Sequence, residues 1–228
     1  MERGTLYGVG VGPGDRELIT LKAIRILQSA QVIAAPDKGQ GEQTALNIVS
    51  EWIGGKPVLS CSAPMVHDRS VLDQAHTQAA DQICDVLDQG KSVAFITLGD
   101  PTVYSTYIYI HRKVMERGYP VELVPGVPSF CAAAAKLNTS LCQGQERLLI
   151  VPACHHVEDT FSVQANKVYM KAGRSLESLK AGLAAHGQLE RASAACNVGM
   201  DNEQIVPHLA DLEGAPGYFS VVLVREEG

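Results

Sequence analysis

The chain has 228 residues, enough for one large domain or for two domains of about 100 residues each. Hydrophobic residues make up 46% and charged residues 19%, a composition typical of a globular protein with a buried core. With 19 basic and 25 acidic residues the formal net charge is −6, which argues against a nucleic acid as partner, because binding to phosphates depends on Lys and Arg.

Short β-rich runs alternate with longer helical patterns, which predicts an α/β architecture. The Pro-Gly stretch "VPGVPS" separates two sets of such elements, so we expect two α/β domains, 1–122 and 123–228. The expected strands are 5–11, 31–34, 57–61, 92–96, 121–124, 147–151, 167–170, 191–197 and 218–224. The expected helices are 20–29, 42–52, 71–88, 103–117, 129–137, 176–186 and a short one at 208–212.

The first strand leads into "VGVGPGD", where a nucleotide-binding fold would place a phosphate loop. The dinucleotide pattern G-x-G-x-x-G fails in both registers, because the third glycine is replaced by Pro13 or by Asp15. Pro13 has no N–H to donate to a phosphate, and the Asp15 carboxylate would repel one. Two interpretations stay open: a tight turn that Asp15 caps, or a floor on which a flat or bulky ligand rests.

A second glycine-bearing loop, "LGDPTVYS", follows the strand at 92–96. It lies at the carboxyl end of a strand, where open α/β sheets bind ligands, so Asp100 is either a ligand contact or a turn cap. Pro101 suits the first position of the next helix. Spacing places four side chains of that helix on one face, which favours a core stripe over a ligand site: Tyr104, Tyr107, Ile108 and His111.

A third strand end repeats this organisation in "VELVPGVPSFCAAAA", with Ser129 as the expected N-cap of a small-residue helix. The alanines leave room either for a ligand or for a neighbouring element. Three glycine-bearing strand ends in one chain favour a shared ligand site over three unrelated turns.

The six cysteines are scattered and form no C-x-x-C pair, which indicates reduced, mostly buried thiols and a cytoplasmic protein. The cluster of Cys154, His155 and His156 is a poor chelator, because adjacent side chains in a strand point to opposite faces, and no metal is expected. The N-terminus shows no secretory signal, and no apolar stretch approaches the roughly 20 residues that a membrane span needs, so no membrane partner is expected.

Five stretches extend over most of the chain and resemble the tetrapyrrole (corrin/porphyrin) methyltransferase family in sequence and order. They are "GVGPGDRELITLKAIRIL", "LGDPTVYSTYIYI", "VPGVPSFCAAA", "VYMKAG" and "NVGM". The second and third stretches are most similar to the branch that methylates C20 of precorrin-2 or cobalt-factor II in cobalamin biosynthesis.

The resemblance implies two α/β domains with a ligand cleft between them, usually in a homodimer. It implies S-adenosylmethionine (SAM) as methyl donor, S-adenosylhomocysteine as product and a tetrapyrrole as substrate. The first domain would hold the tetrapyrrole and the second would complete the SAM site. The positions that match the family's SAM site are Pro13, Leu98, Gly99, Asp100, Val103, Pro128, Ser129, Phe130, Met170 and Gly199.

The chain departs from the family pattern at three places. Arg16 stands where the family usually has Pro, Lys171 where it often has Gly, and Pro128-Ser129 where some members have Thr-Ala. Because the substrate is rich in carboxylates, we expect a local basic mouth for it. The candidate substrate residues are Gly12, Gly14, Arg16, Lys22, Arg112 and Lys171, and the candidate catalytic residues, which would position substrate or remove the displaced proton, are Asp15 and Tyr107.

Three alternatives stay open. A related methylase could act on another corrin carbon, on diphthine or on ribosomal RNA, although the acidic balance argues against RNA. A nicotinamide-dependent oxidoreductase is disfavoured by the failed dinucleotide pattern. A tetrapyrrole carrier without enzymatic activity would bind the pigment but not SAM.

Overall fold

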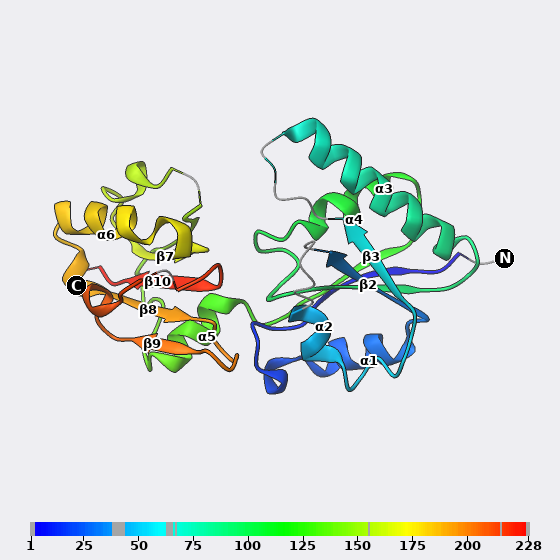
Figure 1. Cartoon of the computed structure of the whole chain (residues 1–228), viewed down its shortest axis with the longest axis horizontal. Coiled ribbons are helices and arrows are strands. Elements are labelled where there is room, and N and C mark those ends of the chain that lie inside the picture. Colours follow the sequence, from blue (N-terminus) through cyan, green and yellow to red (C-terminus); the bar gives the residue numbers. More distant parts are fainter. Residues whose placement is uncertain are drawn as a thin grey trace. The chain divides into compact units, whose positions relative to one another are not determined.

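The computed structural model describes residues 3–37, 44–62, 66, 68–154, 156–214 and 216–226. Its contacts divide the chain into two compact units, Met1–Pro128 and Ser129–Gly228. Each unit contains a five-stranded sheet and helices, so the predicted α/β class is confirmed (Figure 1). The division falls in the predicted Pro-Gly stretch, a few residues beyond position 122.

Unit 1 is built on a parallel sheet with the strand order β3-β2-β4-β1-β5. Its strands are β1 (Leu6–Gly10), β2 (Val32–Asp37), β3 (Val58–Ser62), β4 (Val93–Thr97) and β5 (Val121–Val124). Its helices are α1 (Leu21–Ser29), α2 (Thr44–Val49), α3 (Arg69–Leu87) and α4 (Tyr107–Glu116), with a 3-10 turn η1 (Arg16–Leu18).

The sheet of unit 1 is covered on both faces, as parallel sheets generally are. Val9 and Ile96 pack with α1 and α2 on one face, whereas Leu6 and Phe95 pack with α3 and α4 on the other. Figure 1 shows these two helix pairs on opposite sides of the sheet. The neighbouring carboxyl ends of β4, β1 and β5 therefore lie along one edge.

Unit 2 has a mixed sheet with the order β6-β7-β10-β8-β9, in which only β6 and β7 are parallel neighbours. Its strands are β6 (Leu148–Pro152), β7 (Asn166–Met170), β8 (Ala192–Cys196), β9 (Gln204–Val206) and β10 (Ser220–Val224). Its helices are α5 (Ser129–Lys136) and α6 (Leu176–Ala185), with 3-10 turns η2 (Glu158–Thr160), η3 (Ala172–Ser175), η4 (Leu189–Arg191) and η5 (Leu209–Asp211).

Several element boundaries differ from those predicted. Helix α4 begins at Tyr107 and not at residue 103, because Tyr104 has a φ of +47° and interrupts a right-handed helix. Pro101 therefore lies in a turn, and Tyr104 is exposed outside the helix. Ser129 is the first residue of α5 and not the residue before it. The short strand β9 was not predicted, and the helix expected at 208–212 is the single turn η5.

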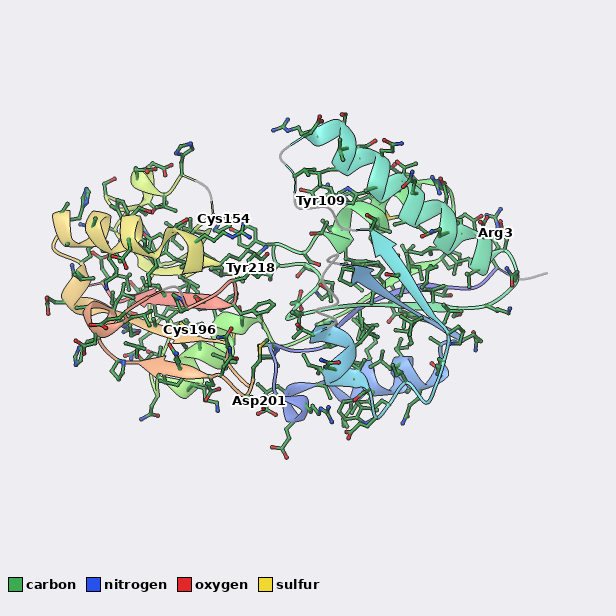
Figure 2. All side chains as sticks on the ribbon, viewed as in Figure 1. Arg3, Tyr109, Cys154, Cys196, Asp201 and Tyr218 are labelled. Atoms are coloured by element: carbon green, nitrogen blue, oxygen red, sulfur yellow. The ribbon has the colours of Figure 1, made fainter. Side chains whose placement is uncertain are left out.

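Helix α2 ends at Val49, before the predicted residue 52, and its predicted start at residue 42 lies outside the described residues. All six cysteines are free, and the expectation that most are buried is wrong because Cys131, Cys142 and Cys154 are exposed. Figure 2 labels the exposed Cys154 and the buried Cys196. Within the described ranges, no helix is long and apolar enough to cross a membrane.

Candidate active site

The loops after β1 and β4 pair with each other at the carboxyl edge of the unit 1 sheet. The Gly99 N–H donates to the Gly12 carbonyl at 2.8 Å, and the Gly12 N–H donates to the Gly99 carbonyl at 3.4 Å. Both glycines have positive φ, +79° at Gly12 and +67° at Gly99, a conformation that other residues adopt only with strain. The glycine spacing of both loops thus serves this backbone pairing.

The loop after β5 packs on the same pair of backbones. A Cβ placed on Gly10 would lie 2.6 Å from the Gly99 carbonyl oxygen and from the Gly126 nitrogen. A Cβ placed on Gly126 would collide with Gly99 and lie 2.7 Å from the Gly10 carbonyl carbon. The three glycine-bearing strand ends therefore converge within unit 1, backbone against backbone.

Asp100 joins two of these loops through its carboxylate. Oδ1 accepts a hydrogen bond from the Thr102 N–H at 2.8 Å, which closes the turn of its own loop. Oδ2 accepts from the Gly126 N–H at 3.0 Å and so holds the loop after β5. The turn-capping interpretation is correct for Asp100, and the same side chain also positions a second loop.

Asp15 also caps a turn. Its Oδ1 accepts from the Glu17 N–H at 2.9 Å at the start of η1, and the residue is partly exposed. Pro13 before it is buried, and Gly14 is partly buried. Segments 6–15, 97–106 and 121–128 contain no Lys or Arg, whereas Asp15 and Asp100 carry carboxylates. These segments therefore offer no cationic side chain to a pyrophosphate.

Tyr107 lies in the core and not at the loop edge. Its side chain is 1% exposed, its hydroxyl lies 3.0 Å from His111 Nδ1 in a hydrogen bond, and its ring packs on Phe95 with centroids 4.9 Å apart. A Cβ on Gly8 would collide with this ring, which explains the glycine in the middle of β1. Burial raises the pKa of the Tyr107 hydroxyl, which makes proton removal from it costly.

Two more predicted residues of the second loop, Leu98 and Val103, are partly buried, and Leu98 packs against the core on the α1 and α2 side. In the third loop, Pro128 is the last residue of unit 1. Phe130, in α5 of unit 2, is buried.

The predicted basic mouth is not assembled within unit 1. Arg16 donates to the Asn47 carbonyl at 2.9 Å and lies 3.9 Å from Glu51, and Lys22 Nζ lies 2.6 Å from Glu122 Oε1. Arg112 is on α4, across the sheet from α1. The structure therefore separates Arg112 from Arg16 and Lys22, because α4 covers the opposite face of the sheet, and it pairs Arg16 and Lys22 with carboxylates.

In unit 2, the loop after β7 lies against the segment that leads into β10. Met170 is buried at the end of β7, and Lys171 follows with a φ of +60°. The Lys171 ammonium lies 5.6 Å from the centroid of the Tyr218 ring, which Figure 2 labels. A Cβ on Gly173 would collide with the Gly217 carbonyl, so these two backbones also touch.

The loop after β8, which contains "NVGM", is held by side chains that the sequence analysis did not select. Asn197 has a φ of +52°, and its side-chain amide donates to the carbonyls of Asn202 at 3.5 Å and Pro216 at 3.4 Å. Gly199 has a φ of +76°, and its N–H donates to Glu203 Oε2 at 2.7 Å. The available signal was Asn197 itself, two residues before Gly199, because Asn tolerates the left-handed region better than most residues.

The described part of the chain holds no group of three or more His, Cys, Asp or Glu side chains placed to bind a metal ion. His155, from the predicted Cys-His cluster, lies outside the described residues.

The model of the Tetrapyrrole (Corrin/Porphyrin) Methylases matches residues 5–213. The chain therefore belongs to the tetrapyrrole methylase family, the class that the loop motifs resembled. A probable cobalt-precorrin-2 C(20)-methyltransferase of Methanocaldococcus jannaschii is 37% identical over 175 residues, which cover 76% of this chain and 75% of that protein. The cobalt-precorrin-2 C(20)-methyltransferase of Salmonella typhimurium is 32% identical over 233 residues, which cover 98% of this chain and 97% of that protein.

Solved structures share the fold. The uroporphyrin-III C-methyltransferase of Thermus thermophilus, solved with S-adenosylhomocysteine, superimposes with a TM-score of 0.72 at 19% identity. The match covers 96% of this chain and 97% of that one.

Proposed function

We propose that this protein is a SAM-dependent C-methyltransferase that methylates C20 of precorrin-2 or cobalt-factor II in cobalamin biosynthesis. The observation that carries the proposal is the 32% identity to the Salmonella C(20)-methyltransferase, because that match covers 98% of this chain and 97% of that enzyme. The proposal includes a homodimer that works in the cytoplasm on a small-molecule substrate, without nucleic acid or membrane as partner.

The residues at the edge of unit 1 fit SAM better than a phosphate cofactor. The N–H groups of Gly12, Gly99 and Gly126 are already donated within the protein, so they are not a phosphate cradle. The carboxylates of Asp15 and Asp100 favour the positive sulfonium of SAM. The proposed SAM contacts are Pro13, Leu98, Gly99, Asp100 and Val103 in unit 1 and Ser129, Phe130, Met170 and Gly199 in unit 2, with Pro128 at their boundary.

Bound SAM supplies a methyl group that is already activated by the sulfonium, so the chain has to orient the two reactants and exclude water. Positioning of this kind contributes on the order of 7–11 kcal/mol in favourable cases. Asp15, partly exposed at the loop edge, is the proposed acceptor of the proton displaced from C20. We assign Tyr107 a structural role in place of the predicted catalytic one, because its hydroxyl is buried and bonded to His111.

For the carboxylate-rich substrate, the proposal retains Gly12, Gly14 and Arg16, which belong to the first loop and its η1 turn. Lys22 is near this loop in sequence but is paired with Glu122, so its contribution requires that this pair opens. Lys171 remains a candidate in unit 2. Arg112 is the weakest candidate, because α4 covers the other face of the sheet.

Calorimetry with SAM and with NAD tests the class of enzyme. We expect binding of SAM and no binding of NAD, whereas the reverse would support an oxidoreductase. Incubation with SAM and either precorrin-2 or cobalt-factor II, followed by mass spectrometry, should show the gain of one methyl group in place of one hydrogen. NMR of the product then locates the methyl group; a methyl group at another carbon would support a related methylase, and tetrapyrrole binding without SAM binding would support a carrier.

A further inference from the structure

A carboxylate and an ammonium group meet beside Gly199 in unit 2. Glu203 Oε2 accepts the Gly199 N–H at 2.7 Å, and Glu203 Oε1 accepts from Lys136 Nζ at 3.0 Å. Lys136 is the last residue of α5, and Glu203 directly precedes β9. The one carboxylate therefore ties the loop after β8 to a helix end that is distant in sequence.

We propose that Glu203 and Lys136 are positioning residues that fix the Gly199 loop in the conformation that receives SAM. The inference rests on the proposed function, since it takes Gly199 as a contact of the methyl donor. Neither side chain needs to touch the reacting atoms in this role.

The loop needs such support because its backbone is unusual. Asn197 and Gly199 both have positive φ, +52° and +76°, within three residues. A non-glycine residue held in this region costs of order 1–3 kcal/mol, so surrounding contacts have to maintain it. The Met200 N–H donates to the Asn197 carbonyl at 2.9 Å, and the Glu203 N–H donates to the Met200 carbonyl at 3.0 Å. These two hydrogen bonds form successive turns that lead from Asn197 to Glu203.

Because Lys136 and Glu203 are partly exposed, their ion pair can position the loop while contributing little to the stability of the fold. The side chains of Lys136 and Glu203 are 44% and 23% exposed, and ion pairs of this kind contribute little to folding. A carboxylate bound to a backbone N–H is in contrast a strong, directional contact. The effect of losing it should therefore appear in ligand affinity at this loop more than in the unfolding temperature.

The test compares E203A, E203Q and K136M with the full-length wild type. A matched control is D81N, which removes another carboxylate–cation pair of unit 1, between Asp81 in α3 and Arg117 directly after α4, at 2.7 Å. Calorimetry measures the Kd for SAM, steady-state kinetics separates KM from kcat, and a thermal scan gives Tm.

We expect E203A to raise the Kd and KM for SAM about 10-fold, as for the loss of a hydrogen bond to a charged group. E203Q and K136M should each raise them about 3-fold, because Gln can still accept the Gly199 N–H and Glu203 can still do so without its lysine. The kcat at saturating SAM and the KM for the tetrapyrrole should stay within about 2-fold of wild type, and Tm should match that of D81N.

Wild-type affinity for SAM in E203A would overturn the inference. So would a fall of Tm far beyond the D81N control with no rescue by E203Q, since that marks a purely structural residue. If E203A does not fold, K136M still tests the inference. An unchanged Kd for SAM in this surface variant would reject a positioning role for the Lys136–Glu203 pair. Failure of the wild type to bind SAM would instead reject the proposed function and the inference together.

Discussion

The Asp100 carboxylate and the Gly126 backbone N–H are joined by a 3.0 Å hydrogen bond that links the loop after β4 to the loop after β5. Since the other oxygen of the same carboxylate accepts the Thr102 N–H, both oxygens face donors. A carboxylate can accept both hydrogen bonds with its two oxygens, whereas the side-chain amide of Asn presents one acceptor and one donor.

Asp100→Asn should therefore weaken the loop junction. We expect the free energy of unfolding to fall by about 1–2 kcal/mol and the affinity for SAM to fall about 10-fold. Urea unfolding and calorimetry measure the two effects. Asp85→Asn, an exposed substitution on α3, is the control and should leave both unchanged; equal behaviour of the two variants would contradict the role given to Asp100.

Tyr107→Phe separates a core tyrosine from a catalytic one. Loss of the hydroxyl leaves His111 Nδ1 without this partner, so we expect the free energy of unfolding to fall by about 1 kcal/mol. The kcat should stay within about 2-fold of wild type. A 100-fold lower kcat with unchanged stability would restore the original prediction that Tyr107 takes part in the chemistry.

Arg16→Glu tests the contact with the carboxylate-rich substrate. We expect the KM for the tetrapyrrole to rise about 5- to 10-fold, because a repulsive charge replaces an attractive one, while the Kd for SAM stays unchanged. Arg25→Glu is a matched control from an exposed position of α1. If Arg16→Glu weakened both ligands equally, its guanidinium would act through the fold, by way of Asn47 and Glu51.

Lys56 caps the end of α1 from another part of the chain. Its ammonium donates to the carbonyls of Leu27 at 2.7 Å, Gln28 at 2.5 Å and Ala30 at 2.7 Å. Lys56→Met should lower the free energy of unfolding by about 1–2 kcal/mol, because these helix-terminal carbonyls lose a charged donor. The ammonium of Lys91 donates to the exposed Gln89 side chain at 2.9 Å, so Lys91→Met should change the free energy of unfolding by less than about 0.5 kcal/mol in a urea titration of both variants.

Glu203 gives a pH dependence with a defined sign. The Gly199 N–H, and then Lys136, lower the pKa of Glu203 below its ordinary value. Its contribution to stability is therefore present above the ordinary glutamate pKa of about 4.5 and is lost as the pH falls through the lowered pKa of the folded state. The difference in unfolding free energy between wild type and E203Q should stay constant from neutral pH to about pH 5 and shrink in more acidic buffer. A difference that grows with acid would contradict this assignment.

The sequence predicted the strand ends well, because Gly, Pro and Asp directly after apolar runs are local signals. From them followed the convergence of three strand ends, at Gly10, Gly99 and Gly126. The start of α4 was misplaced because Tyr104 has a φ of +47°, a left-handed conformation that is uncommon for Tyr and that helical periodicity does not reveal. Tyr107 was placed on a helix face correctly, but periodicity alone does not tell that its hydroxyl meets His111 inside the core.

The other misses depended on partners distant in sequence. Arg112 was grouped with Arg16 and Lys22 because the charge pattern of a helix does not encode which side of the sheet that helix covers. Lys136 and Glu203 were not selected because 67 positions separate them, and neither belongs to a motif with a known spacing. Arg16 was noted as a departure from the family, yet its contact with the Asn47 carbonyl became visible only in the folded chain.

The backbone junction of Gly10, Gly99 and Gly126 also has a consequence for engineering the protein. Since a Cβ on Gly10 or Gly126 would meet main-chain atoms and not movable side chains, neither position can be enlarged by repacking its neighbours. A library that seeks new acceptor specificity should leave this junction fixed. It should vary Gly14, Arg16 and Glu17 instead, which are partly or fully exposed beside the same edge. Asp15 and Val103, which belong to the proposed site, should stay unchanged.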